Sequence, residues 1–126
     1  MKKVIQTDNA PAAIGPYSQA IEVAGTLYIS GQVPVDPETG KIVEGGIEAQ
    51  TERVLKNIGA ILEAAGLEFE HVVKSTVLLD DIGNFSQMNE VYKSFYKENS
   101  PARAAFQVAA LPLGAMIEIE TIAVRN

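Results

Sequence analysis

The 126-residue chain contains no cysteine and no tryptophan, and it has a single histidine, His71. Without cysteine it has no disulfide, no Cys-ligated metal and no thiol nucleophile. A Ser-His-Asp triad would have to use His71, and no Gly-x-Ser-x-Gly motif accompanies it. The motifs HExxH and GxGxxG are also missing, so we expect neither a metal nor a dinucleotide cofactor.

Basic side chains are scarce as well. Ten Lys and Arg residues stand against sixteen Asp and Glu, which gives a net charge of −6, and Lys2-Lys3 is the only basic doublet. Because phosphate contacts dominate nucleic-acid affinity, nucleic acid is not the expected partner. No apolar run reaches the roughly 18 to 20 residues that cross a bilayer, and the N-terminus lacks the apolar segment of a signal peptide. We therefore expect a cytoplasmic protein without a membrane partner.

The chain has the length and apolar content of one globular domain spanning residues 1–126, with 47% hydrophobic residues. Hydrophobic periodicity predicts two helices, over 47–65 and from a cap at Asn84 to about Asn99. Alternation and turn residues predict six strands, over 3–6, 18–23, 27–30, 71–79, 102–109 and 117–123. The order β-β-β-α-β-α-β-β favours an α+β fold with a single mixed sheet and both helices on one face.

Such a fold leaves the second face of the sheet without a covering layer. The strand at 71–79 nevertheless alternates two apolar sets, Val72 and Leu78 against Val73, Val77 and Leu79. A large exposed apolar surface usually marks an interface. Patterning alone therefore predicts that copies of the chain associate into a homo-oligomer through this face.

The candidate site residues centre on the stretch from Ser100 to Glu120. Arg103 is its only cation, and its planar fork matches a carboxylate. Glu118 could orient or deprotonate a water molecule. Tyr17 follows the turn-forming pair Gly15-Pro16, and Ser30-Gly31 lies at the end of a predicted strand. Each also has a structural alternative, as a packing aromatic, a turn former or, for Glu118, a solvated strand residue.

Arg103 and Glu118 do not meet within a simple hairpin. If the last two strands pair about Pro112-Leu113, Glu118 stands opposite Gln107 and shares a face with Arg103, about 13 Å away along the strand. A site at a subunit boundary, with Arg103 from one chain and Glu118 from the next, would bring the two together.

The chain resembles the Rid (YjgF) family of imine deaminases from end to end. The segments that carry the resemblance are Ala13-Ile14-Gly15-Pro16-Tyr17-Ser18-Gln19, Ile29-Ser30-Gly31-Gln32-Val33-Pro34, Asn89-Glu90-Val91-Tyr92, Pro101-Ala102-Arg103 and Ile117-Glu118-Ile119-Glu120. The resemblance implies a chorismate-mutase-like fold and a homotrimer with a barrel-like centre and sites between subunits. It also implies cofactor-free hydrolysis of 2-imino acids, such as 2-iminobutanoate and 2-iminopropanoate, to 2-keto acids and ammonia.

The resemblance also implies roles for individual residues. Arg103 would grip the substrate carboxylate, Glu118 would activate water, and Tyr17 would present a hydroxyl near the substrate. The remaining pocket residues would be Ser30, Gly31, Asn89 and Ala105.

The chain departs from the family's common pattern in two places. Ala104-Ala105 stand where many members have Ser-Cys, and Ala110 stands where many have arginine. These departures leave open which imines the pocket accepts. Two other functions stay open beside the deaminase, a non-catalytic trimer that binds 2-keto acids as a regulator and a role in RNA metabolism or translation; a holdase-type chaperone is a further alternative.

Overall fold

The computed structural model describes all residues from Met1 to Asn126. The main sheet consists of β1 (Lys3–Ile5), β2 (Ala20–Val23), β3 (Thr26–Gln32), β6 (Val72–Leu79), β7 (Ala102–Gln107) and β8 (Ile117–Val124). A small second sheet consists of β4 (Val35–Asp36) and β5 (Lys41–Ile42). The helices are α1 (Ile47–Ala64) and α2 (Phe85–Phe95), and short 3-10 turns occupy Phe69–His71, Ile82–Asn84 and Pro112–Gly114.

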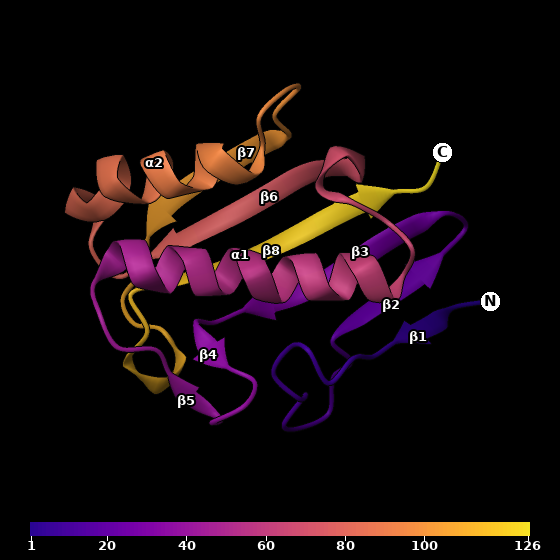
Figure 1. The fold of residues 1–126 in the computed structure, drawn as a ribbon, viewed down its shortest axis with the longest axis horizontal. Helices are drawn as coiled ribbons and strands as arrows, with labels where there is room; N and C mark the ends of the chain where they lie inside the picture. Colours follow the sequence, from indigo (N-terminus) through magenta and orange to yellow (C-terminus); the bar gives the residue numbers. More distant parts are fainter.

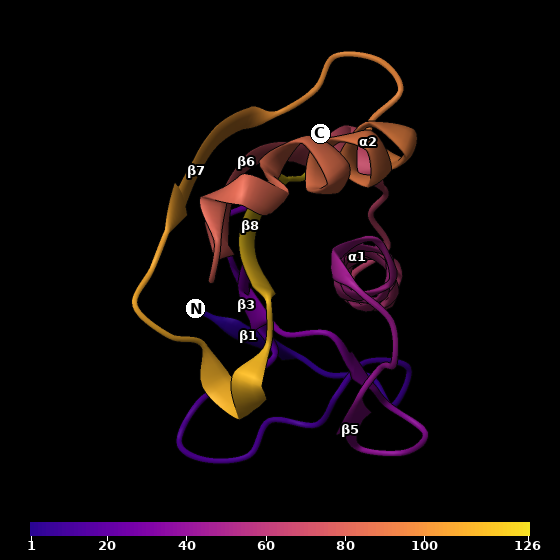
Figure 2. The ribbon, with the colours of Figure 1, turned by 90° about the vertical axis from the view of Figure 1, so that its left-hand side faces the viewer.

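The main sheet is mixed, with strand order β1-β2-β3-β8-β6-β7. Only β6 and β7 pair in parallel, and the other neighbours are antiparallel. Both helices cover the same face of this sheet (Figure 1, Figure 2). The predicted α+β fold with two helices on one face of a mixed sheet is confirmed. The β4–β5 hairpin was not predicted from the sequence. Neither helix is long and apolar enough to cross a membrane.

The last two strands do not form a hairpin. β6 lies between β7 and β8 and pairs with both. The chain passes from β6 through α2 to a parallel β7 at the edge of the sheet, and β8 then fills the place between β6 and β3. A strand in this central position satisfies the backbone groups of two neighbours, whereas a hairpin with β7 would leave β8 at the edge.

The core lies between α1 and the central strands. The apolar stripe of α1 is almost entirely buried, as its helical spacing predicts. It comprises Val54, Leu55, Ile58, Ile61 and Leu62. Gly66, with φ 74°, ends the helix in the left-handed conformation, where the Leu67 N–H donates to Leu62 O.

The second helix begins directly after Asn84, as predicted, but its cap and its C-terminal end differ from the prediction. Met88 and Tyr92 are its buried residues. The Asn84 side chain, however, makes no capping hydrogen bond. Asp81 instead accepts a hydrogen bond from Gly83 N at 2.8 Å and starts a 3-10 turn that leads into the helix. The helix ends at Phe95, because Tyr96 leaves the helical conformation.

The opposite face of the sheet has no covering layer, as predicted. Large apolar side chains on it are exposed to solvent, among them Tyr28 and Phe106, each 49% exposed. Val72 and Leu78 were predicted on the same face of β6, but they lie on opposite faces. The reason is a register shift in the pairing with β8 between Val72 and Lys74. This irregularity turns Val72 into the helix-covered core and leaves Val73 exposed on the open face.

Candidate active site

Arg103 lies on the edge strand β7 and faces the helix layer. It stands opposite Ser75 of β6, a buried residue on the helix-covered face. Its Nη1 donates a hydrogen bond to Asn89 Oδ1 at 2.7 Å. The guanidinium carbon lies 5.3 Å from the ring centre of Phe85 and 4.8 Å from that of Tyr92. The structure therefore brings two predicted site residues, Arg103 and Asn89, into contact.

Glu118 lies on β8 and faces the open side of the sheet. It is half-buried and stands opposite Leu78 of β6. Burial raises the pKa of Glu118, and the charge of Glu120 two residues along the strand raises it further. A carboxylate with a raised pKa accepts a proton more readily than an ordinary one, which suits a general base.

Gly31 makes room for the Glu118 carboxylate. A methyl group on Gly31 would overlap Glu118 Oε2 and would lie 2.9 Å from the carboxyl carbon. The pairing of β3 with β8 shifts register between Ile29 and Gln32, so Gly31 sits in an irregular part of the strand. Glu118 and Gly31 are thus the second pair of predicted residues that the structure brings together.

Ser30 and Tyr17 belong to the surroundings of this second pair. Ser30 Oγ donates to Ser18 O at 2.6 Å, which ties the segment after Tyr17 to β3. The Tyr17 side chain is 52% exposed, and its hydroxyl accepts from Ile14 N at 3.4 Å. The Tyr17 hydroxyl is therefore presented by a surface loop, next to the strand that carries Gly31.

Within one chain, Arg103 and Glu118 belong to opposite faces of the sheet. The prediction that they share a face is wrong, because it assumed a β7–β8 hairpin. Two strand spacings separate β7 from β8, about 10 Å, and the register offsets the two residues by a further 10 Å or so along the strands. Ala105 lies on the face of Arg103, where it packs partly buried against the core.

The structure thus contains two separate groups of predicted residues. The cation group consists of Arg103, Asn89 and Ala105 on the helix-covered side of the sheet edge. The base group consists of Glu118, Gly31 and Ser30 on the open side, with Tyr17 in the adjoining loop. A guanidinium can grip a carboxylate and a carboxylate can activate water, but one small molecule cannot reach both groups of a single chain.

Two contributions to these groups were not recognised in the sequence. The rings of Phe85 and Tyr92 enclose the guanidinium of Arg103. The helical spacing of these aromatics predicts only an apolar helix face that packs on the sheet. The second contribution comes from the buried Gln19. Its Nε2 donates to the carbonyls of Thr7, Ala10 and Pro11 and thereby anchors the loop that carries Tyr17. In the sequence, the only sign of this role is a glutamine beside a turn-rich segment.

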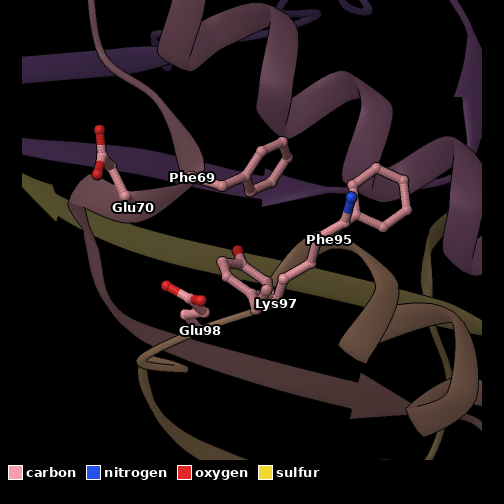
Figure 3. Close-up of a pocket in the computed structure, with 6 residues that line it drawn as sticks. Phe69, Glu70, Phe95, Lys97 and Glu98 are labelled. Carbon is pink, nitrogen blue, oxygen red and sulfur yellow. The ribbon is translucent and has the colours of Figure 1, made fainter.

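A depression elsewhere on the surface contains none of the predicted residues. It has a volume of about 370 Å³ and lies between the turn Phe69–His71 and the end of α2. Figure 3 shows Phe69 and Phe95 at one side of it and the carboxylates of Glu70 and Glu98 at the other. Lys97 is the third charged residue of its lining, so the depression has no excess of positive charge for an anionic ligand. No cluster of three or more His, Asp or Glu side chains in the protein is placed to hold a metal ion.

Comparison with known proteins places these residues in context. Residues 7–125 match the family model described as Endoribonuclease L-PSP, the model of the Rid (YjgF) family. The chain is 56% identical over its full length to a mouse protein named 2-iminobutanoate/2-iminopropanoate deaminase, of which it covers 93%.

Two solved structures share the fold. The structure of RidA from an Antarctic Psychrobacter species has a TM-score of 0.93 and 53% identity, over 97% of this chain and 98% of that one. The structure of Escherichia coli TdcF with bound serine has a TM-score of 0.94 and 43% identity, over 98% of this chain and 99% of that one.

Proposed function

Because the chain belongs to the Rid family, we propose that it is an imine deaminase whose site combines Arg103 of one subunit with Glu118 of a neighbouring subunit. The activity is hydrolysis of 2-iminobutanoate and 2-iminopropanoate to the corresponding 2-keto acids and ammonia. The single observation that carries this activity is the 56% identity, over the whole chain, to a protein that bears the name of this enzyme.

The two groups of residues divide the chemistry between them. Arg103 binds the carboxylate of the imino acid through two parallel N–H···O bonds, because Asn89 occupies only one edge of the guanidinium. A protonated imine is already electrophilic at C2. Orientation and one base therefore suffice for the addition of water, without a cofactor.

Glu118 is the base in this proposal. It accepts a proton from the water molecule as the oxygen bonds to C2, which gives a tetrahedral carbinolamine. Glu118 then returns the proton to nitrogen. The C–N bond breaks and ammonia leaves. Glu118 takes the proton of the hydroxyl as the C=O bond of the keto acid forms, and this proton then passes to the released ammonia. Burial, which raises the pKa of Glu118, favours both the uptake and the return of the proton.

A homotrimer explains why the two groups lie apart in one chain. The open face of the sheet exposes Tyr28, Val73 and Phe106 together with half-buried Glu118. A neighbouring subunit that covers this face would bury those side chains. We propose that it also brings its own Arg103 up to Glu118, so that each boundary forms one site and three boundaries close a barrel.

The remaining parts of the proposal concern the setting of the enzyme. We propose that residues 1–126 work as one domain in the cytoplasm, where the protein removes reactive imines and enamines that PLP enzymes release. Small 2-imino acids and 2-keto acids are then its ligands. RNA is disfavoured as a partner, because the chain carries a net charge of −6 and two of its carboxylates, Glu118 and Glu120, lie on the open face.

A coupled assay tests the activity. A PLP-dependent dehydratase generates 2-iminobutanoate from threonine, and semicarbazide traps the imine that remains. We expect the protein to accelerate the loss of trappable imine, and we expect Arg103→Ala to abolish this acceleration. The matched control is Arg53→Ala on α1, which removes an arginine that bonds Asn57 and lies outside both groups.

The same assay separates the deaminase from its alternatives. A protein that binds 2-oxobutanoate without accelerating imine loss would instead be the regulatory keto-acid binder. A protein that neither hydrolyses the imine nor binds the keto acid would refute both, and salt-dependent RNA binding would then point to the role in RNA metabolism. Full activity of Arg103→Ala would refute the carboxylate grip alone.

A further inference from the structure

The guanidinium of Arg103 is enclosed by three residues of α2. Phe85, Asn89 and Tyr92 follow one another at helical spacing and present one face of the helix to β7. Asn89 Oδ1 accepts a hydrogen bond from Nη1, and the two rings lie 5.3 Å and 4.8 Å from the guanidinium carbon. Cations bind to aromatic faces at these distances. The closer of the two rings is that of Tyr92.

Tyr92 is held more rigidly than a surface aromatic would be. Only 4% of it is exposed, and its ring packs on Tyr96 with 4.7 Å between the ring centres. Tyr96 in turn makes an edge contact with Phe69. A buried ring that is held in this stack cannot follow the motions of an arginine, and it therefore restricts them.

Tyr92 is one of four buried residues whose hydroxyl groups have no hydrogen-bond partner. Ser75 of β6 stands opposite Arg103 in β7 and opposite Thr121 in β8. The hydroxyls of Ser75, Tyr92, Tyr96 and Thr121 are buried and make no hydrogen bond within the chain. Burial raises the pKa of Tyr92 and of Tyr96, although the nearby Ser75 hydroxyl opposes this change in both and the charge of Arg103 opposes it in Tyr92. Both tyrosines are therefore neutral, and Tyr92 offers Arg103 an uncharged ring face.

A fixed guanidinium has a direct advantage for ligand binding. A free arginine loses much rotamer freedom when it grips a carboxylate, and this loss weakens binding. An arginine that is already held by two rings and an amide has lost that freedom before the ligand arrives. Its remaining N–H groups then keep one orientation towards the ligand.

We propose that Tyr92 is a positioning residue of imine hydrolysis. Its buried ring holds the Arg103 guanidinium in the orientation that receives the substrate carboxylate, and it does not touch the substrate. This inference rests on the proposed role of Arg103. It adds a residue that the sequence pattern assigns to packing alone.

The test compares three variants of the full-length protein. Tyr92→Leu removes the ring but keeps an apolar side chain, whereas Tyr92→Phe keeps the ring and removes the hydroxyl. Phe95→Leu is the matched control, since Phe95 is a half-buried aromatic of the same helix whose ring packs on Phe69 and not on Arg103. For each we would measure KM and kcat with 2-iminobutanoate and, by calorimetry, the Kd of 2-oxobutanoate.

We expect Tyr92→Leu to raise KM and the keto-acid Kd together, each by about tenfold, with kcat changed by less than about threefold. A carboxylate grip acts on the ground state and the transition state alike, which is why KM carries the effect. Tyr92→Phe should keep the parental value of both constants, and Phe95→Leu should leave them unchanged as well. Should Tyr92→Leu not fold, Tyr92→Met carries the same test with a more adaptable side chain.

A double-mutant cycle shows whether Tyr92 acts through Arg103. In the Arg103→Ala background, Tyr92→Leu should weaken the residual keto-acid binding no further. An equal loss in both backgrounds would overturn the proposal, and so would an active parent protein whose KM and Kd are unaffected by Tyr92→Leu. A parent that neither hydrolyses imines nor binds keto acids would instead refute the proposed function, on which the positioning role depends.

Discussion

The carboxylate of Glu118 lies directly against the backbone of Gly31, in the space that any side chain at residue 31 would fill. A methyl group there would overlap Oε2 and lie 2.9 Å from the carboxyl carbon. The backbone of Gly31 does not have the positive φ that favours glycine elsewhere in the chain. Close approach of the carboxylate, and not backbone conformation, is therefore what requires a glycine between Ser30 and Gln32.

Gly31→Ala should disable the enzyme. The added methyl must push the Glu118 carboxylate away from its place, and a displacement of about 1 Å in a catalytic group can cost about 100-fold in rate. Because Glu118 Oε2 is the far end of a flexible side chain, its displacement should cost little folding free energy. Steady-state kinetics and urea unfolding would measure the two effects.

The control for this variant is Gly46→Ala at the start of α1. A methyl on Gly46 meets nothing within 4 Å, and the residue has φ −90°. We expect the activity of Gly46→Ala to match that of the parent. Parental activity of Gly31→Ala would show that Glu118 can shift without consequence, which would contradict its role as the base.

Glu118→Gln should retain keto-acid binding and lose activity by about 10²–10⁴-fold, the usual contribution of a general base. The base is active only when deprotonated, so kcat/KM should fall as the pH falls through the pKa of Glu118. This acid limb lies above the range of an ordinary carboxyl, because burial and then Glu120 raise that pKa. In Glu120→Gln the limb should move to lower pH, and an unmoved limb would exclude the influence of Glu120.

The same carboxyl affects stability with a definite sign. Since the pKa of Glu118 is higher in the folded chain than in the unfolded chain, its contribution to stability is full below the unfolded value and is lost as the pH rises through the folded value. Glu118→Gln should therefore raise the Tm near neutral pH and lose this advantage in acid. A Tm difference that does not change between these conditions would contradict the raised pKa.

The sequence predicted the helices and strands, and which residues share a face of each, better than it predicted which strands lie side by side in the sheet. The spacing of Val54, Ile58 and Ile61 is a local property of one helix, and the structure confirms it. The alternation around Arg103 and around Glu118 was likewise correct within each strand. Local periodicity fixes which residues share a face, because side chains alternate along a strand.

The relative placement of strands is not a local property. Nothing in the period of β7 or β8 shows that β6 lies between them, and this insertion moves Arg103 and Glu118 to opposite faces. The irregular pairing at Val72 and at Gly31 was also invisible, since a bulge shifts the register without changing composition. The enclosure of Arg103 by Tyr92 depends on how α2 crosses the sheet, which only the packed structure defines.

Phe106→Glu should break the proposed homotrimer without unfolding the subunit. Phe106 is 49% exposed on the open face, so the isolated chain should tolerate the change within about 0.5 kcal/mol. In an interface the same carboxylate would be buried without a partner, which is strongly unfavourable. Sedimentation velocity should show a smaller species with unchanged circular dichroism. A parent that sediments as a monomer would refute the trimer itself.

Mixing two inactive variants tests whether each site spans two subunits. Arg103→Ala keeps an intact Glu118, and Glu118→Gln keeps an intact Arg103. If the chains are refolded together in equal amounts and the site takes one residue from each of two neighbours, random assembly leaves about a quarter of the sites with both groups intact. The mixture should then recover about 25% of the parental activity, although each variant alone is inactive. If both residues of a site came from the same chain, no mixed assembly would contain an intact site and the mixture would stay inactive. Recovered activity that disappears when Phe106→Glu is added to both variants would tie the complete site to the open face of the sheet.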